Sequence, residues 1–137
     1  MSVEFVDTNI LVYAHDRGAG AKHDRSVELL ERLTEDGSGA LSIQVLAEFY
    51  VTATKKLGMT SQEAEEVLAD LGGWIIHRPA HADLLRAARV HRRYHVSWWD
   101  ALILTSATEL GCGLLWTEDL SDGQRYGSVT ARNPFRL

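Results

Sequence analysis

The hydrophobic positions of the chain fall into short apolar runs that alternate with longer segments of helical periodicity. Strands are predicted at the short runs, which are Val3–Val6, Ala40–Ile43, Trp74–Ile76 and Leu114–Thr117. Helices are predicted where apolar residues recur every three or four positions, over His23–Glu35, Gln44–Lys56, Thr60–Leu71, His81–His95 and Trp98–Leu110. A further short β-prone piece lies near Val129.

Strands and helices alternate in this pattern from one end of the chain to the other. Such an order is typical of parallel strands whose connecting helices cover both faces of the sheet. The length of 137 residues is close to that of one domain, and the sequence contains no internal repeat or low-complexity segment. The sequence therefore predicts a single α/β domain over residues 1–137, with a central parallel β-sheet flanked by helices on both faces.

Composition narrows the class of protein. The chain is 45% hydrophobic and 24% charged, which is typical of a globular domain. Its net charge of -5 argues against a protein that coats nucleic acid by bulk attraction, but not against an enzyme that meets RNA through a metal ion. Cys112 is the single cysteine, which excludes a disulfide framework and fits a reducing compartment. No apolar run approaches the ~20 residues of a membrane span, so we expect a soluble, cytoplasmic protein with no membrane partner.

Four acidic residues lie at or near the carboxyl ends of predicted strands, or near the start of the following helix. Asp7 follows the first strand directly, and Asp119 follows Leu114–Thr117. Glu48 and Asp100 lie in predicted helices with no basic residue three or four positions away. Because open α/β sheets bind ligands at the carboxyl ends of their strands, these acids are candidates for one site.

The mutual repulsion of clustered carboxylates must be offset by a positive charge. Two of them ~4 Å apart repel by about 1 kcal/mol in water and by about 4 kcal/mol at an effective dielectric constant of ~20. A hard divalent cation such as Mg²⁺ or Mn²⁺ removes this cost and prefers oxygen ligands. Such an ion suits phosphodiester hydrolysis, since it activates a water and offsets charge on the phosphate.

Each acid also has a separate structural interpretation. Asp7 could cap a following helix, and Asp100 lies three residues after Ser97 in a capping-box arrangement. Glu48 could be a partly exposed helix residue, and Asp119 could belong to a polar turn. These interpretations explain the acids one at a time, but they do not explain why all four fall at one edge of the predicted sheet.

Four sequence runs resemble the motifs of PIN domains and occur in the same order. They are FVDTNILVYA (Phe5–Ala14), LSIQVLAEFY (Leu41–Tyr50), SWWDALIL (Ser97–Leu104) and LWTEDL (Leu115–Leu120). Within that family the chain is most similar to the VapC-type ribonuclease toxins of bacterial toxin–antitoxin pairs. The resemblance implies a metal-dependent endoribonuclease using Mg²⁺ or Mn²⁺, and a homodimer that is neutralised by a small antitoxin.

The resemblance also implies roles for individual residues. The acids that hold the metal, with a metal-bound water attacking the RNA phosphate, would be Asp7, Glu48, Asp100 and Asp119. Asn9 and Thr117 match polar positions beside these acids, where they would orient the carboxylates. Asp122 is an additional acid close to Asp119, but its position farther from the strand favours Asp119.

Basic residues line one side of the predicted helix His81–His95. Arg86, Arg89 and Arg93 would form either a solvated face or a strip that contacts RNA phosphates beside the acids.

Two other functions remain open at this stage. One is a domain that keeps the fold and binds RNA or a protein without cutting. The other is a phosphatase with Asp7 as nucleophile, which is disfavoured because Asn9 stands where such enzymes usually carry a second aspartate.

Overall fold

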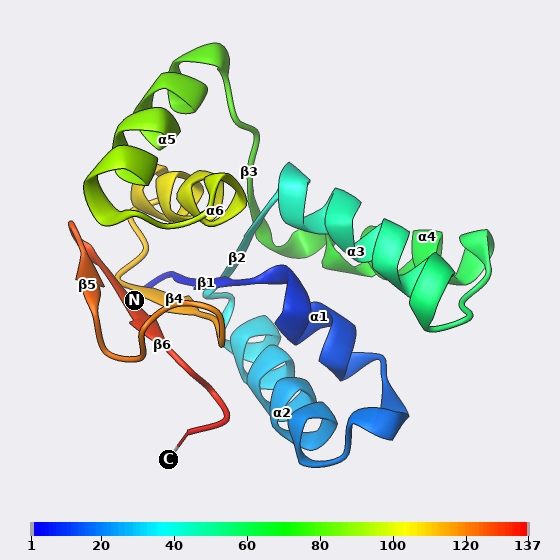
Figure 1. Cartoon of the computed structure of the whole chain (residues 1–137). Coiled ribbons are helices and arrows are strands. Elements are labelled where there is room, and N and C mark those ends of the chain that lie inside the picture. The colour runs from blue at the N-terminus through cyan, green and yellow to red at the C-terminus, as the bar shows by residue number, and fades with distance from the viewer. Residues whose placement is uncertain (1, 137) are drawn as a thin grey trace.

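A mostly parallel sheet forms the centre of the molecule in the computed structural model, which describes residues 2–136 (Figure 1). In spatial order its six strands are β3 (Ile75–His77), β2 (Gly39–Ser42), β1 (Glu4–Val6), β4 (Leu114–Trp116), β6 (Val129–Arg132) and β5 (Arg125–Tyr126). All neighbouring strands are parallel except β5, which runs antiparallel to β6. The predicted α/β fold with a central parallel sheet is confirmed.

Helices cover both faces of this sheet, as predicted. They are α1 (Thr8–Ala14), α2 (Ala21–Asp36), α3 (Ile43–Lys56), α4 (Ser61–Asp70), α5 (His81–Tyr94) and α6 (Trp98–Glu109), with 3₁₀ turns η1 (Arg17–Ala19) and η2 (Leu71–Gly73). In Figure 1, α5 and α6 lie above the sheet, α1 and α2 lie below it, and α3 and α4 extend to the right. Among residues 2–136, no helix is both long enough and apolar enough to cross a membrane.

Several boundaries differ from the predicted ones for local reasons. Strand β2 ends at Ser42 and not at Ile43, because the Ser42 hydroxyl accepts a hydrogen bond from Val45 N and starts α3 there. Strand β3 begins at Ile75 because Trp74 ends the η2 turn, and the Trp74 ring packs so closely on Gly39 that a Cβ at that position would lie 2.5 Å from it. The hairpin of β5 and β6 is more extensive than the β-prone piece predicted near Val129.

The pairing of β1 with β4 positions the functional edge of the sheet. Val6 is opposite Trp116 in the register, so the two strands end side by side. The core behind them contains fully buried side chains from both strands and from the helices, including Phe5, Leu115, Phe49 and Leu104. Side chains that follow Val6 and Trp116 are therefore held at the carboxyl edge by well-packed strands.

Candidate metal centre

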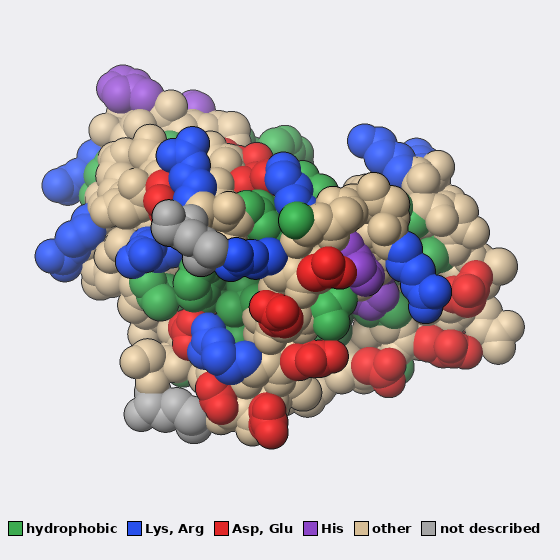
Figure 2. All heavy atoms as spheres, turned by 90° about the horizontal axis from the view of Figure 1, so that it is seen from below, with side chains coloured by type: hydrophobic (Ala, Val, Ile, Leu, Met, Phe, Trp, Pro, Cys, Tyr) green, Lys and Arg blue, Asp and Glu red, His purple; other side chains and the backbone are tan. Residues whose placement is uncertain are grey.

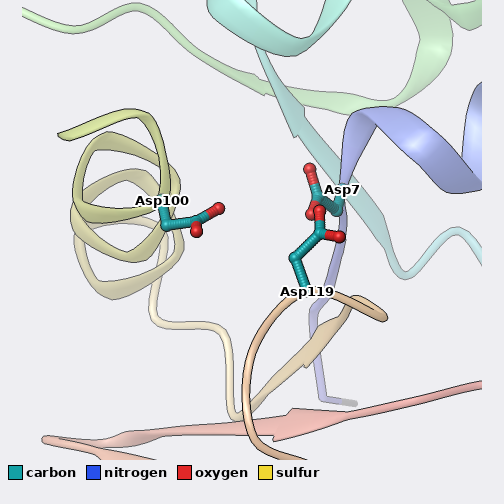
Figure 3. A group of neighbouring side chains, drawn as sticks. All are labelled: Asp7, Asp100 and Asp119. Carbon is teal, nitrogen blue, oxygen red and sulfur yellow. The ribbon is translucent and has the colours of Figure 1, made fainter. Parts of the chain in front are cut away.

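Three carboxylates converge at this edge (Figure 3). Asp7 follows β1, Asp100 lies in the first turn of α6, and Asp119 lies in the loop after β4. One oxygen of each lies within 4.8 Å of the other two. Asp7 is buried, Asp100 is partly buried and Asp119 is exposed, so the cluster is open to solvent on one side.

Asp7 has two roles at once. It is the N-cap of α1, and its Oδ1 accepts a hydrogen bond from Thr8 N at 2.6 Å. Its Oδ2 accepts a hydrogen bond from the Thr117 hydroxyl at 2.8 Å. The capping interpretation of Asp7 and its membership of an acid cluster therefore both hold.

Asp100 begins its helix in a similar way. Ser97 caps α6 by accepting a hydrogen bond from Asp100 N at 3.1 Å. The carboxylate of Asp100 is directed toward Asp7 and Asp119 in Figure 3. The cap thus fixes the backbone of Asp100 and leaves its side chain available for the cluster.

Thr117 and Asn9, both predicted to lie beside the acids, hold two of them in place. Thr117 donates to Asp7, and its hydroxyl oxygen also accepts a hydrogen bond from Asp119 N at 3.1 Å. Asn9 Nδ2 donates to Asp119 Oδ2, also at 3.1 Å. A single hydroxyl therefore links the backbone of one acid to the carboxylate of another.

The electrostatics of the cluster are unfavourable in the absence of a cation. Burial, followed by the charges of Asp119 and Asp100, raises the pKa of Asp7 to about 7, although hydrogen bonds from Thr117 and Thr8 act in the opposite direction. The pKa of Asp119 is raised by burial and by the charges of Asp100 and Glu118. No Lys, Arg or His of residues 2–136 forms an ion pair with these three carboxylates. An all-oxygen set lacking a positive partner fits Mg²⁺ or Mn²⁺.

Glu48 lies outside the group of three. Its Oε1 accepts hydrogen bonds from the Thr8 hydroxyl at 2.9 Å and from Gln44 Nε2 at 3.3 Å. Since Thr8 N binds Asp7, Glu48 reaches the cluster through Thr8. Thr8 was not predicted as a site residue, although its place directly after Asp7 was a usable signal.

Asp122 lies outside the group of three acids. Its Oδ1 accepts a hydrogen bond from Asn133 N at 2.8 Å and lies 3.8 Å from Arg132 Nε, so it secures the C-terminal segment.

Glu118, the residue before Asp119, was not predicted as a site residue. It accepts hydrogen bonds from the Tyr13 hydroxyl and, at 2.7 Å, from Lys22 Nζ. Burial alone would raise the pKa of Glu118, but these hydrogen bonds outweigh it and lower the pKa.

The three arginines predicted as a strip lie along one side of α5 but have different surroundings. Arg86 forms ion pairs with Asp83 at 3.0 Å and with Glu109 at 3.4 Å. Glu109 is the last residue of α6, which places it about 14 Å along the helix axis from Asp100. Arg89 and Arg93 line a hollow of about 260 Å³ beside α5, together with Tyr94 and Tyr126.

Comparison with known proteins identifies a family and a shared fold. A family model described as "PIN domain" matches residues 5–121. A search of curated proteins found no match.

Several solved structures share the fold. A toxin–antitoxin complex from Klebsiella pneumoniae is 23% identical, with a TM-score of 0.72 over 99% of this chain and 100% of that one. VapBC2 from Rickettsia felis, bound to a DNA fragment from its promoter, is 21% identical, with a TM-score of 0.69 over 96% and 98%. The sarcin–ricin loop cleaving toxin VapC20 from Mycobacterium tuberculosis is 18% identical, with a TM-score of 0.66 over 85% and 89%.

Proposed function

The chain belongs to the PIN domain family, and from that premise we propose that it is an endoribonuclease dependent on Mg²⁺ or Mn²⁺ and the toxin of a toxin–antitoxin pair. The observation that carries the proposal is the convergence of Asp7, Asp100 and Asp119 within 4.8 Å at the carboxyl edge of the sheet. Support for the RNA substrate comes from one structural neighbour, the sarcin–ricin loop cleaving toxin of Mycobacterium tuberculosis.

Asp7, Asp100 and Asp119 are the proposed direct ligands of the ion. A bound Mg²⁺ or Mn²⁺ would supply an activated water and offset the charge that develops on the scissile phosphate. Glu48 belongs to the same proposed site through Thr8. Glu48 accepts a hydrogen bond from the Thr8 hydroxyl, and the Thr8 N–H donates a hydrogen bond to Asp7. Its task is to orient Thr8, so that the Asp7 carboxylate keeps one rotamer.

The remaining polar groups position the ligands. The Thr117 hydroxyl fixes Asp7 Oδ2, and Asn9 Nδ2 fixes Asp119 Oδ2, which leaves the other lone pairs of both carboxylates free to bind a cation. Because the pKa of Asp7 is about 7, this carboxyl can lose its proton near neutral pH as the ion binds.

The proposed partners are RNA, a small antitoxin protein and a second copy of the chain. The antitoxin is supported by structural neighbours that are toxin–antitoxin complexes. An antitoxin that covers the acid cluster would stop cleavage, so activity should be measured with protein purified free of it.

The test is cleavage of total cellular RNA by the purified chain. We expect discrete fragments with Mg²⁺ or Mn²⁺, none with EDTA, and none with Asp100→Asn. Asp122→Asn is the matched control, because Asp122 is a nearby acid that binds Asn133 and Arg132 and not the cluster. Unchanged cleavage by Asp100→Asn would refute the site. A folded wild type that binds RNA but never cuts it would favour the non-catalytic alternative.

A further inference from the structure

A basic hollow lies between α2 and the segment that follows β6. Its volume is about 550 Å³, and its walls include Arg25, Arg32, Trp116, Arg132 and Arg136, with Glu28 as the acidic member. Figure 2 shows Lys and Arg side chains gathering on part of the face where the chain ends, with Asp and Glu side chains gathered on another part. In a chain of net charge -5, this local concentration is not a consequence of overall composition.

Two of the four arginines of the basic hollow are free to bind an anion. Arg32 is held by Glu4 at 2.9 Å, and Arg132 lies 3.8 Å from Asp122. No carboxylate of residues 2–136 forms an ion pair with Arg25 or Arg136. The guanidinium fork matches a phosphate group well, so these two side chains give the basic hollow a preference for phosphate.

The basic hollow and the acid cluster share the end of β4. Trp116 lines the hollow, and the next residue, Thr117, binds Asp7. Thr117 N donates to the Arg132 carbonyl oxygen at 3.0 Å, so one residue contacts both sites. The hollow and the cluster are therefore connected through Trp116 and the residue that follows it.

Helix α2 continues the basic surface toward the cluster. Lys22 lies one turn before Arg25, and its Nζ is 2.7 Å from Glu118, the neighbour of Asp119. From Lys22 to Arg32 the helix axis extends about 15 Å. Lys22 and Arg32 are each paired with an acid, so among these three cations of α2 Arg25 is the one that no carboxylate of residues 2–136 pairs.

Trp116 adds an aromatic surface to these charges. The indole is partly buried, and its Nε1 donates to Glu4 Oε1 at 2.8 Å, which fixes the ring. Glu4 also accepts from Arg32, so one buried carboxylate orders both an aromatic and a guanidinium group in the wall of the hollow. Aromatic rings between phosphate-binding cations are typical of surfaces that hold single-stranded nucleic acid.

We propose that the basic hollow binds the phosphate backbone of the single-stranded RNA segment next to the cleavage point, with Arg25 and Arg136 as its phosphate contacts. This inference rests on the proposed function for the identity of the nucleic acid. It assigns the RNA to the α2 side of the molecule and not to the strip on α5.

The experiment measures binding of a fluorescein-labelled single-stranded RNA of mixed sequence by anisotropy, in EDTA so that the RNA stays intact. The test variant is Arg25→Ala/Arg136→Ala, and the matched control is Arg89→Ala/Arg93→Ala in the hollow beside α5. Losing two phosphate contacts on single-stranded RNA reduces the slope of log K against log salt by about 1.4. We expect that reduction in the test variant and an unchanged slope in the control, with identical thermal unfolding of all three proteins.

Each other outcome overturns the inference in a recognisable way. An unchanged slope in the test variant refutes the basic hollow, and a reduced slope only in the control assigns the RNA to α5. Loss of antitoxin binding with an unchanged RNA slope assigns the hollow to the protein partner. Cleavage with Mn²⁺ reports separately on the proposed function: a wild type that cuts RNA while the test variant keeps its slope refutes the hollow alone. An arginine-dependent slope without any cleavage refutes the nuclease alone.

Discussion

Two buried carboxylates lie at opposite ends of β1, and their electrostatic surroundings are reversed. Glu4 and Asp7 are similarly buried, at 9% and 5% exposed. Glu4 accepts two hydrogen bonds from Arg32 and one from Trp116, and the Arg32 contact lowers its pKa in spite of burial. Asp7 has only uncharged donors, and burial together with the charges of Asp119 and Asp100 raises its pKa to about 7.

Burial alone therefore does not decide what an acid does. The same strand and the same degree of burial support an acid that stabilises the fold and an acid that destabilises it in its charged form. Glu4 already has its positive partner in Arg32. Asp7 and its two neighbours have none among residues 2–136, which is the situation that a divalent cation resolves.

Asp7→Asn should have the greatest effect, because it removes the buried carboxylate that has no positive partner among residues 2–136. Cleavage of RNA should fall about a thousandfold, because several kcal/mol of charge stabilisation by the ion are lost. In EDTA at pH 8 the variant should be more stable than wild type by at most roughly 4 kcal/mol, for a pKa shift from 3.8 to about 7, because the amide can accept only one of the two hydrogen bonds that Asp7 accepts.

The sign of this stability difference depends on pH. Because the folded pKa of Asp7 lies above the unfolded one, its penalty is present above pH 7 and is relieved as the pH falls through 7 toward 3.8. Urea unfolding at pH 8 and at pH 4 measures both limits. A variant that is less stable than wild type at pH 8 would contradict the account of Asp7.

The second effect concerns the hydroxyl that holds Asp7. Thr117→Val keeps the shape but removes the donor to Asp7 and the acceptor of Asp119 N. Affinity for Mn²⁺ and the cleavage rate should fall by about 10 to 100-fold, as is usual for residues that orient metal ligands. Thr117→Ser should retain most of both. Calorimetric titration with Mn²⁺ is the measurement, and wild-type affinity in the valine variant would show that the hydroxyl is dispensable.

The third effect tests the opposite end of the strand. Glu4→Gln weakens the contact with Arg32 and should cost roughly 2 kcal/mol of unfolding free energy at pH 7, since Arg32 is 46% exposed and the pair is partly screened. The pKa of Glu4 is lowered by folding, so this stabilisation exists above pH 4.5 and disappears as the pH falls through the folded value. Asp36→Asn, which removes the looser 3.7 Å pair with Arg32, is the control and should cost much less. A large loss of kcat in Glu4→Gln would contradict the separation of the two acids.

A change of pH in the wild-type protein should have the smallest effect. Below pH 7 the ion must displace a proton from Asp7, so affinity for Mn²⁺ should fall by up to about tenfold for each pH unit. Calorimetry in two buffers of different ionisation enthalpy counts the proton released. Affinity that stays constant between pH 5.5 and pH 7 would show that Asp7 does not bind the ion.

Much of the fold was predictable because the hydrophobic periods are strong and the connections short. The elements that were missed or misplaced depend on single contacts between distant residues. No bounds were predicted for helix α1, since its start depends on the Asp7 cap, and β3 is displaced by the packing of Trp74 on Gly39. The β5–β6 hairpin has little hydrophobic pattern of its own and is recognisable chiefly from its pairing with β4.

The candidate site was predictable to the level of a sheet edge but not to the level of contacts. Asp7 and Asp119 follow parallel strands, whose carboxyl ends share one edge of a sheet, so a common edge could be expected, whereas the direct pairing of β1 with β4 could not. A helix position indicates which side Glu48 faces but not its depth, and Thr8 stands between it and the cluster. Likewise the contact of Lys22 with Glu118 joins residues 96 positions apart, and no local pattern in the sequence indicates it.

The hydrogen bond from Thr117 to Asp7 also limits when the acid cluster can form during synthesis. It joins Asp7, near the start of the chain, to a hydroxyl 110 residues later, and β4 pairs directly with β1 near the middle of the sheet. A ribosome that adds about 5 to 20 residues per second needs several seconds or longer to pass from Asp7 to Asp119. Until Asp119 emerges, the nascent chain carries an incomplete set of acids. The proposed metal site can therefore form only after the ribosome has passed that residue.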